Sequence, residues 1–195
     1  MGTRGAIVLV ANGEQKAIYN HWDSYPSGLG VEMLNFTRKN KRRSKAFPAE
    51  VAALKPVPST EPTADDFVKY AEFHDPGVDT GKSWYSLLRH TQGDIPATLK
   101  AGLFEPSDSF LADSLFCEWA YVIDCDNKVF EVYEGFQSEP HTMGRFASMP
   151  SSGGYCPVKL VAAFPFAELP TDAEFLAWAS AEREAKDAAY EAANA

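Results

Sequence analysis

Residues 18–30, with the sequence IYNHWDSYPSGLG, bring together several side chains that could do chemistry. In an extended strand alternate side chains share one face, which would place Tyr19, His21 and Asp23 together. A carboxylate beside an imidazole can orient the ring and raise its pKa, as in a general acid–base pair. The spacing therefore predicts His21 as a general base and Asp23 as the group that orients it.

Neighbouring side chains would complete such a site. Across a hairpin with a two-residue turn, positions 4 and 21 are roughly opposite, so Arg4 could bind anionic groups beside His21. The predicted binding residues are Arg4, Tyr19, Trp22, Ser24 and Tyr25. His21 and Asp23 could also supply two metal ligands, but the local sequence offers no third. We therefore predict no metal site and no cofactor.

The same segment also has a purely structural interpretation. Asp23 and Ser24 are typical capping residues, Pro26 stiffens the chain, and Trp22 could pack over the end of a sheet. No nucleophile stands at a useful spacing from His21. The sequence also lacks a P-loop, a dinucleotide-binding glycine motif, a Gly-x-Ser-x-Gly elbow and zinc-type His or Cys pairs. Both interpretations stay open at this point.

A β-hairpin before the segment and a helix after it would hold it in place. Residues 4–11 and 14–21 are rich in apolar and β-branched side chains and flank Asn12-Gly13, the pair best suited to a type I′ turn. After the segment, Leu29, Met33 and Phe36 follow helical spacing. The segment therefore links the end of a strand to the start of a helix.

The remaining chain predicts a second hairpin, a further strand and several helices. Residues 117–136 form the hairpin, and the run Asp124-Cys125-Asp126-Asn127 is interpreted as its turn rather than as a metal loop. The apolar stretch 157–166 is expected to be a central strand. Short helices are expected at 49–54, 64–74, 83–91 and after Asp94, and a longer helix begins at the capping box formed by Thr171 and Glu174.

This order of elements predicts the α+β class. The expected architecture is an antiparallel sheet built from two β-hairpins plus one further strand, with helices packed on one side or end. Residues 1–180 would form a single α+β domain. Residues 181–195 are rich in Ala and Glu and are expected to be the exposed or frayed end of the C-terminal helix.

Charge and composition restrict the function classes. The net charge of −9 disfavours general nucleic-acid binding, because phosphates would be repelled. Residues 38–45 nevertheless hold six of the 18 basic side chains, and their role is left open. No apolar run is long enough to span a membrane. Three cysteines without metal or redox spacing favour a reducing compartment, and we expect a cytoplasmic protein.

The beginning of the chain resembles a group of uncharacterised proteins from bacteria, their phages and fungi. These proteins open with Thr-Arg, continue as strand, turn and strand, and carry a His-x-Asp-(Ser/Gly)-Tyr-Pro motif. The resemblance covers about the first 36 residues. The matching positions are Thr3, Arg4, Gly5, Tyr19, His21, Trp22, Asp23, Ser24, Tyr25, Pro26, Gly28, Leu29 and Gly30. It implies a location for a site and no activity.

Three functional hypotheses follow. The first is a phage-type or bacterial accessory protein that binds a protein partner, such as a host protein. The alternative is a small hydrolase or transferase acting on an anionic, nucleotide-like substrate through the pair His21 and Asp23. In the third, the segment is structural only.

Overall fold

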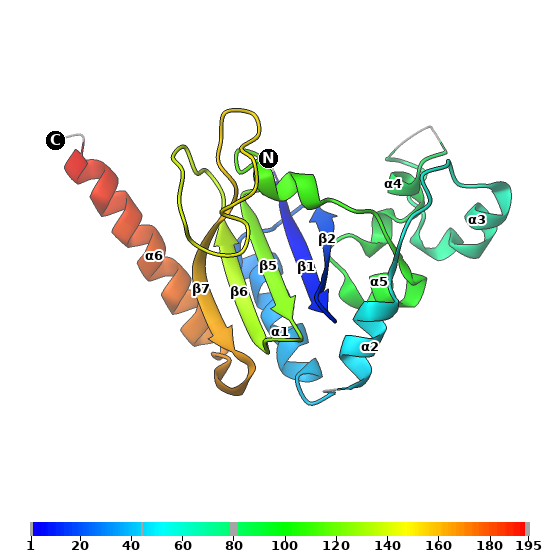
Figure 1. Cartoon of the computed structure of the whole chain (residues 1–195), viewed down its shortest axis with the longest axis horizontal. Helices are drawn as coiled ribbons and strands as arrows, with labels where there is room; N and C mark the ends of the chain where they lie inside the picture. The colour runs from blue at the N-terminus through cyan, green and yellow to red at the C-terminus, as the bar shows by residue number, and fades with distance from the viewer. Residues whose placement is uncertain (1, 44, 79–81, 194–195) are drawn as a thin grey trace.

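The computed structural model describes residues 2–43, 45–78 and 82–193 and has the α+β fold (Figure 1). A five-stranded mixed sheet has the strand order β2-β1-β5-β6-β7. The strands are β1 (Gly5–Ala11), β2 (Glu14–Asn20), β5 (Trp119–Asp124), β6 (Val129–Glu134) and β7 (Lys159–Pro165). The α-helices are α1 (Val31–Asn40), α2 (Ala46–Ala53), α3 (Ala64–Lys69), α4 (Trp84–Leu87), α5 (Ile95–Ala101) and α6 (Asp172–Ala193).

Both predicted hairpins are confirmed. β1 and β2 pair antiparallel from Gly5 with Asn20 to Ala11 with Glu14. Asn12 and Gly13 between them have φ angles of 55° and 76°, the left-handed conformation that a two-residue hairpin turn requires. β5 and β6 pair antiparallel in the same way.

The prediction of a wholly antiparallel sheet is wrong, because β1 and β5 pair in parallel. The first strand of each hairpin is the more apolar one, and these two strands lie side by side where both faces of the sheet are covered. The long connection between β2 and β5 returns the chain to the end of the sheet where β1 begins. Both strands therefore run in the same direction.

The predicted central position of residues 157–166 is also wrong, since β7 lies at the edge of the sheet. Its apolar character has another cause. The rings of Phe164, Phe175 and Trp178 pack together, so α6 covers one face of the strand. In the hairpin β5–β6, the outer edge of β5 is already paired with β1. The only edge left for β7 is that of β6, so β7 lies at the end of the sheet.

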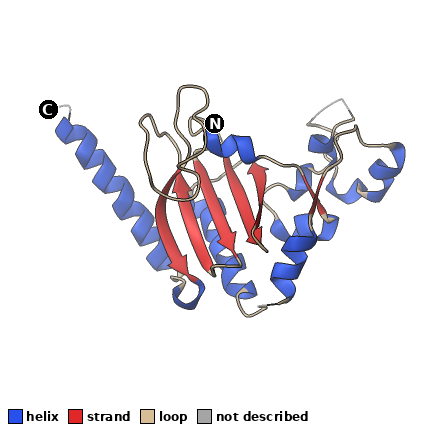
Figure 2. Ribbon diagram, in the orientation of Figure 1, coloured by secondary structure: helices blue, strands red, loops and turns tan. Residues whose placement is uncertain are grey.

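The two faces of the sheet have different covers (Figure 2). Helices α1, α2 and α6 pack on one face over a core that includes Ile7, Tyr121 and Phe130. On the other face, 3₁₀ turns and irregular loops cover a core that includes Val8 and Phe146. The sheet thus separates a helical layer from a layer of loops.

A smaller group of elements lies beyond the outer edge of β2, where Ile18 forms an isolated antiparallel bridge with Pro106. Helices α3, α4 and α5 surround a separate apolar cluster that includes Tyr70, Trp84 and Leu87. Two short strands, β3 (Lys55–Pro56) and β4 (Leu103–Phe104), pair in parallel in this region. The sequence did not predict them. The helix predicted at 64–74 is shorter, because α3 ends at Lys69 and a 3₁₀ turn, Ala71–Phe73, follows it. Asp94 caps α5 as predicted.

The turn of the second hairpin is built by a buried carboxylate. Asp124 accepts hydrogen bonds from the backbone N–H groups of Asp126 and Asn127 at 3.0 and 2.8 Å. Its other oxygen accepts a hydrogen bond from the Arg145 guanidinium at 2.6 Å, and that guanidinium also binds Glu131. The acidic run therefore has turn chemistry, and Arg145 fixes a loop to the sheet.

The C-terminal helix begins at the predicted capping box, in which the Thr171 hydroxyl accepts a hydrogen bond from the N–H of Glu174 and the Glu174 carboxylate binds the Thr171 N–H. α6 continues as helix to Ala193, past residue 181, and projects beyond the sheet (Figure 1). The C-terminal helix was predicted to extend to residue 195, but residues 194–195 lie outside the described part of the chain. Among the described helices, none is long and apolar enough to cross a membrane.

Candidate functional site

The chain turns sharply after β2. Asp23 has a φ angle of 52°, a left-handed conformation that is uncommon for a residue other than Gly. Its carbonyl oxygen accepts a hydrogen bond of 2.9 Å from the N–H of Leu29, which closes a tight loop. A Cβ atom on Gly28 would lie only 2.3 Å from the same oxygen, so the loop requires a glycine there. A wide helical turn, Pro26–Gly30, then leads into α1.

Ser24 holds this loop against the sheet. Its side chain is fully buried, and its hydroxyl accepts a hydrogen bond of 2.8 Å from the Asn20 amide. Its N–H donates to the carbonyl of Thr3, and its own carbonyl accepts from the Tyr121 hydroxyl at 2.8 Å. Ser24 was predicted to bind a ligand, but its burial places it out of reach, and it acts as an anchor.

Tyr19 and His21 form a hydrogen-bonded pair at the end of β2. The Tyr19 hydroxyl lies 2.7 Å from Nδ1 of His21. The rings of Phe110 and Tyr19 form a T-shaped pair, and so do the rings of Trp22 and His21, whose centroids are 4.3 Å apart. The imidazole is therefore held by a phenol on one side and an indole on the other.

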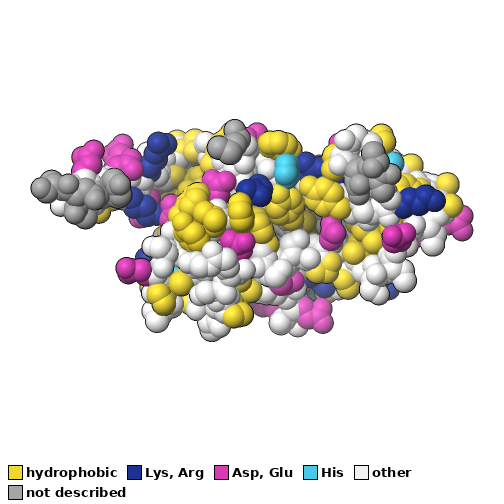
Figure 3. Space-filling view, turned by 90° about the horizontal axis from the view of Figure 1, so that it is seen from above, with side chains coloured by type: hydrophobic (Ala, Val, Ile, Leu, Met, Phe, Trp, Pro, Cys, Tyr) yellow, Lys and Arg dark blue, Asp and Glu magenta, His cyan; other side chains and the backbone are white. Residues whose placement is uncertain are grey.

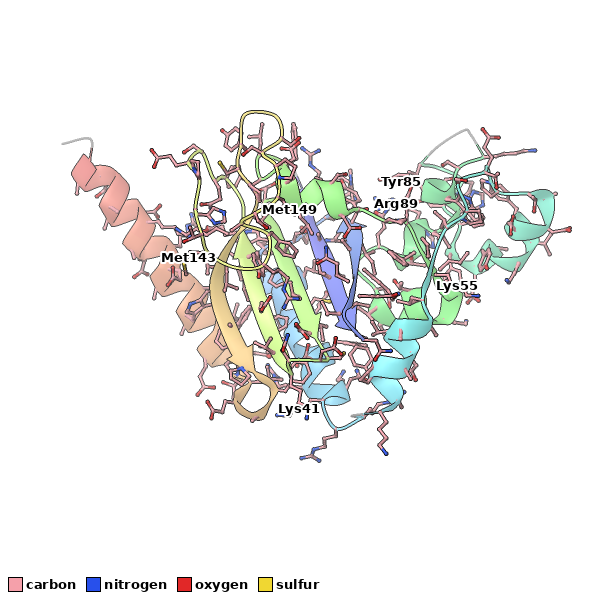
Figure 4. The ribbon with its side chains drawn as sticks, in the orientation of Figure 1. Lys41, Lys55, Tyr85, Arg89, Met143 and Met149 are labelled. Atoms are coloured by element: carbon pink, nitrogen blue, oxygen red, sulfur yellow. The ribbon has the colours of Figure 1, made fainter. Side chains whose placement is uncertain are left out.

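Two arginines flank this pair. Arg4 precedes β1, opposite His21 in the register of the hairpin, and its guanidinium lies 4.5 Å above the ring of Phe116. Arg89 follows α4, and its guanidinium lies 5.6 Å from the ring centroid of Tyr85. Tyr85 in turn contacts Tyr19, with ring centroids 6.5 Å apart. Figure 4 shows Tyr85 and Arg89 beyond the end of β2.

We call Arg4, Tyr19, His21, Tyr85 and Arg89 the arginine cluster. Burial lowers the pKa of His21, and the positive charges of Arg89 and Arg4 lower it further. Burial and the nearby Tyr85 raise the pKa of Tyr19, although both arginines oppose that shift. Near neutral pH the imidazole and the phenol are therefore uncharged, and the cluster carries two guanidinium charges.

The predicted pairing of His21 with Asp23 does not form. The strand ends at Asn20 and the chain turns left-handed at Asp23, so the alternation of a strand no longer applies. Within the described residues, no hydrogen bond or ion pair joins the two side chains, and the partner of the imidazole is Tyr19. Asp23 instead acts on Tyr25, whose pKa it raises by its charge. The predicted rise in the pKa of His21 is also wrong.

Apolar side chains surround the cluster at this end of the molecule. The exposed fractions of Trp22 and Phe116 are 56% and 42%, and that of Phe136 is 55%. Figure 3 views this end of the molecule, with yellow side chains gathered around a histidine and neighbouring Lys or Arg side chains. Tyr25 is 39% exposed. The site therefore opens to solvent between aromatic groups.

The sequence did not identify Arg89 and Tyr85 as site residues. They stand four positions apart, the spacing at which two side chains share one face of a helix. This spacing was the available signal, but nothing local relates that face to His21, which lies 68 positions from Arg89 in the chain. The described residues include no group of three or more His, Cys, Asp and Glu side chains that could hold a metal.

Comparisons with known proteins yield no match, whether to family models, to curated proteins or to solved structures. The functional argument consequently rests on the geometry of the arginine cluster.

Proposed function

We propose that this protein binds an anionic ligand at the arginine cluster. One observation carries the proposal: Arg4 and Arg89 flank the same uncharged Tyr19–His21 pair, and in the described parts of the chain neither guanidinium forms an ion pair with a carboxylate. The contacts that the two residues do make are weaker competitors for an anion: the Arg89 guanidinium donates to the amide oxygen of Gln92, and the backbone N–H of Arg4 donates to the Glu118 carboxylate at 3.3 Å. This is notable in a protein with a net charge of −9. Other arginines of the chain do pair with carboxylates, namely Arg38, Arg43, Arg145 and Arg183.

The side-chain types suit a phosphate, sulfate or carboxylate group. A guanidinium presents several N–H donors in a planar fork and binds such anions with charge-assisted hydrogen bonds. Tyr19 and His21 add uncharged polar atoms between the two cations. The Arg4 guanidinium lies over the ring of Phe116 and the Arg89 guanidinium lies near the ring of Tyr85, so both cations are partly ordered before a ligand arrives. This preorganisation lowers the entropic cost of binding.

Titration calorimetry with inorganic pyrophosphate tests this proposal. We expect the wild-type protein to bind it and Arg89→Gln to bind it at least about tenfold more weakly, because a hydrogen bond to a charged group contributes about 1.5–3 kcal/mol. Arg183→Gln is the matched control. It removes the same charge from an exposed position on α6, where the nearest carboxylate, of Asp187, lies 3.9 Å away.

The control separates a specific site from general charge attraction. Equal losses in Arg89→Gln and Arg183→Gln would contradict the proposal, as would a wild-type protein that binds no pyrophosphate at low salt. Melting curves of both variants show whether each one is folded.

Catalysis at this site is a second candidate, and the state of His21 favours it. The imidazole is uncharged near neutral pH, and its Nδ1 lies 2.7 Å from the Tyr19 hydroxyl. In the tautomer whose Nδ1–H donates to the Tyr19 oxygen, Nε2, which has no hydrogen-bond partner among the described residues, can accept a proton from a ligand. A hydrolase or transferase would use His21 as a base, with Tyr19 in the orienting role first assigned to Asp23. Release of phosphate from a nucleotide, lost in His21→Gln but not in Asp23→Asn, would support this mechanism. Equal rates of phosphate release in the wild-type protein, His21→Gln and Asp23→Asn would exclude His21 as the base.

Binding of a protein partner is a third candidate, and the exposed aromatic side chains favour it. Trp22, Phe116 and Phe136 are all more than a third exposed, and tryptophan in particular is common among residues that dominate binding energy at interfaces. A specific partner recovered by the wild-type protein but not by Trp22→Ala would support this role. If Trp22→Ala recovers the same partners as the wild-type protein, the result would count against a binding role for this aromatic surface.

A further inference from the structure

A hollow of about 400 Å³ lies beside the arginine cluster and shares Arg89 with it. Its other lining residues are Asn20, Trp22, Asp75, His90, Gln92 and Asp94, and the side-chain oxygen of Gln92 accepts a hydrogen bond from the Arg89 guanidinium, which a bound anion would replace. Its volume lies within the range of small-molecule sites, which is roughly 300–1,000 Å³. Because Arg89 belongs to both the cluster and the hollow, an anion bound to Arg89 would place the rest of its molecule in the hollow.

Trp22 offers a fixed aromatic surface to that molecule. A Cβ atom on Gly2 would lie 2.0 Å from Cε3 of the indole, so the backbone of Gly2 packs directly against the ring. The rings of Trp22 and His21 also meet in a T-shaped contact. More than half of the side chain is nevertheless exposed. An aromatic ring that is both held in place and open to solvent suits the stacking of a planar group.

The two carboxylates supply hydrogen-bond acceptors. One oxygen of Asp94 caps α5 by accepting from the N–H of Ala97, and one oxygen of Asp75 accepts from the N–H of Gly77. The second oxygen of Asp75 lies 3.9 Å from Nε2 of His90, beyond hydrogen-bond distance. Within the chain as described, the second oxygen of Asp94 has no hydrogen-bond partner. Hydroxyl groups of a ligand are suitable donors to these oxygens.

From these features we infer that the ligand is a nucleoside 5′-monophosphate. This inference rests on the anion site proposed above. The phosphate binds Arg89 and Arg4, the base stacks on Trp22, and the ribose hydroxyls donate to Asp75 and Asp94. A phosphosugar would leave Trp22 unused, and a phosphorylated peptide would lack a diol for the carboxylates. The negative charges of Asp75 and Asp94 disfavour a longer phosphate chain in the hollow.

The test compares AMP, ribose 5-phosphate and inorganic phosphate by titration calorimetry. We expect AMP to bind at least about tenfold more tightly than ribose 5-phosphate, because stacking of a base on an aromatic ring has this magnitude. Trp22→Ala should abolish that difference, because only AMP has a base that can stack on the indole. Phe136→Ala is the matched control, since it removes an equally exposed aromatic ring that does not line the hollow.

Each outcome decides one of the two proposals. Equal affinities of the wild-type protein for AMP and ribose 5-phosphate would overturn the nucleotide while leaving the anion site intact. Failure of all three phosphates to bind would overturn the anion site itself. The comparison of ligands on the wild-type protein decides the matter even if Trp22→Ala does not fold.

Discussion

The hydroxyl of Tyr121, on β5 near the middle of the sheet, donates a hydrogen bond of 2.8 Å to the carbonyl oxygen of Ser24, in the loop after β2. The two residues stand 97 positions apart in the chain. The contact is buried, and the backbone of Gly30 approaches the same hydroxyl so closely that a Cβ atom there would lie 2.9 Å from it. A single buried phenol therefore ties the second hairpin to the loop that carries His21.

Tyr121→Phe is expected to lower the free energy of unfolding by about 1–2 kcal/mol, because it leaves the Ser24 carbonyl without its buried donor. Urea denaturation measures this loss. Tyr25→Phe removes a hydroxyl from a ring that is 39% exposed and should change stability by no more than about 0.5 kcal/mol. Equal losses in the two variants would show that the buried contact has no special contribution.

Gly28→Ala is expected to destabilise the protein by about 1–3 kcal/mol, since the new methyl group would overlap the Asp23 carbonyl oxygen and the loop must move. Gly77→Ala is a suitable control, because the atom nearest its Cβ would be a side-chain oxygen of Asp75 at 3.2 Å. Thermal melts compare the two. A stable Gly28→Ala protein with unchanged pyrophosphate affinity would show that the tight loop is dispensable.

Sulfate binding is expected to strengthen as the pH falls from about 8 to about 5.5, while the charge of sulfate stays constant. In the free protein the pKa of His21 lies below its ordinary value of 6.5. A bound anion stabilises the imidazolium and raises that pKa, so binding takes up a proton and low pH favours it. The affinity should rise roughly tenfold for each unit by which the pKa rises. Titrations at several pH values measure this slope.

His21→Gln provides the control for this dependence. Its sulfate affinity should stay nearly flat over the same pH range, because glutamine does not titrate. If the wild-type protein binds sulfate with an affinity that also does not change with pH, the anion binds away from His21.

Arg145→Met is expected to lower the free energy of unfolding by about 2–4 kcal/mol, because it leaves the fully buried Asp124 carboxylate without its cation. The ion pair of Arg43 with Glu50 is close to half exposed on both sides. Arg43→Met should therefore cost no more than about 1 kcal/mol. Denaturant titrations of the two variants give the comparison, and similar losses would contradict the structural role assigned to Arg145.

Local patterns were sufficient for much of the fold. The pair Asn12-Gly13 indicated the first hairpin because its backbone preference depends on two adjacent residues. The capping residues Asp94 and Thr171 indicated helix starts for the same reason, since a cap satisfies N–H groups within one turn. The parallel pairing of β1 with β5 had no such signal, because it depends on how a long connection returns the chain.

For the candidate site too, some features could be predicted from local sequence and others could not. The sequence alone predicted a site at residues 18–30, and it placed Arg4 opposite His21, since register across a short hairpin follows from the turn. Only the tertiary structure decided that Tyr19 is the partner of the imidazole, that Ser24 is buried, and that Arg89 completes the cluster. These depend on a left-handed turn at Asp23 and on packing between segments far apart in the chain, and neither is encoded in the spacing of neighbouring residues.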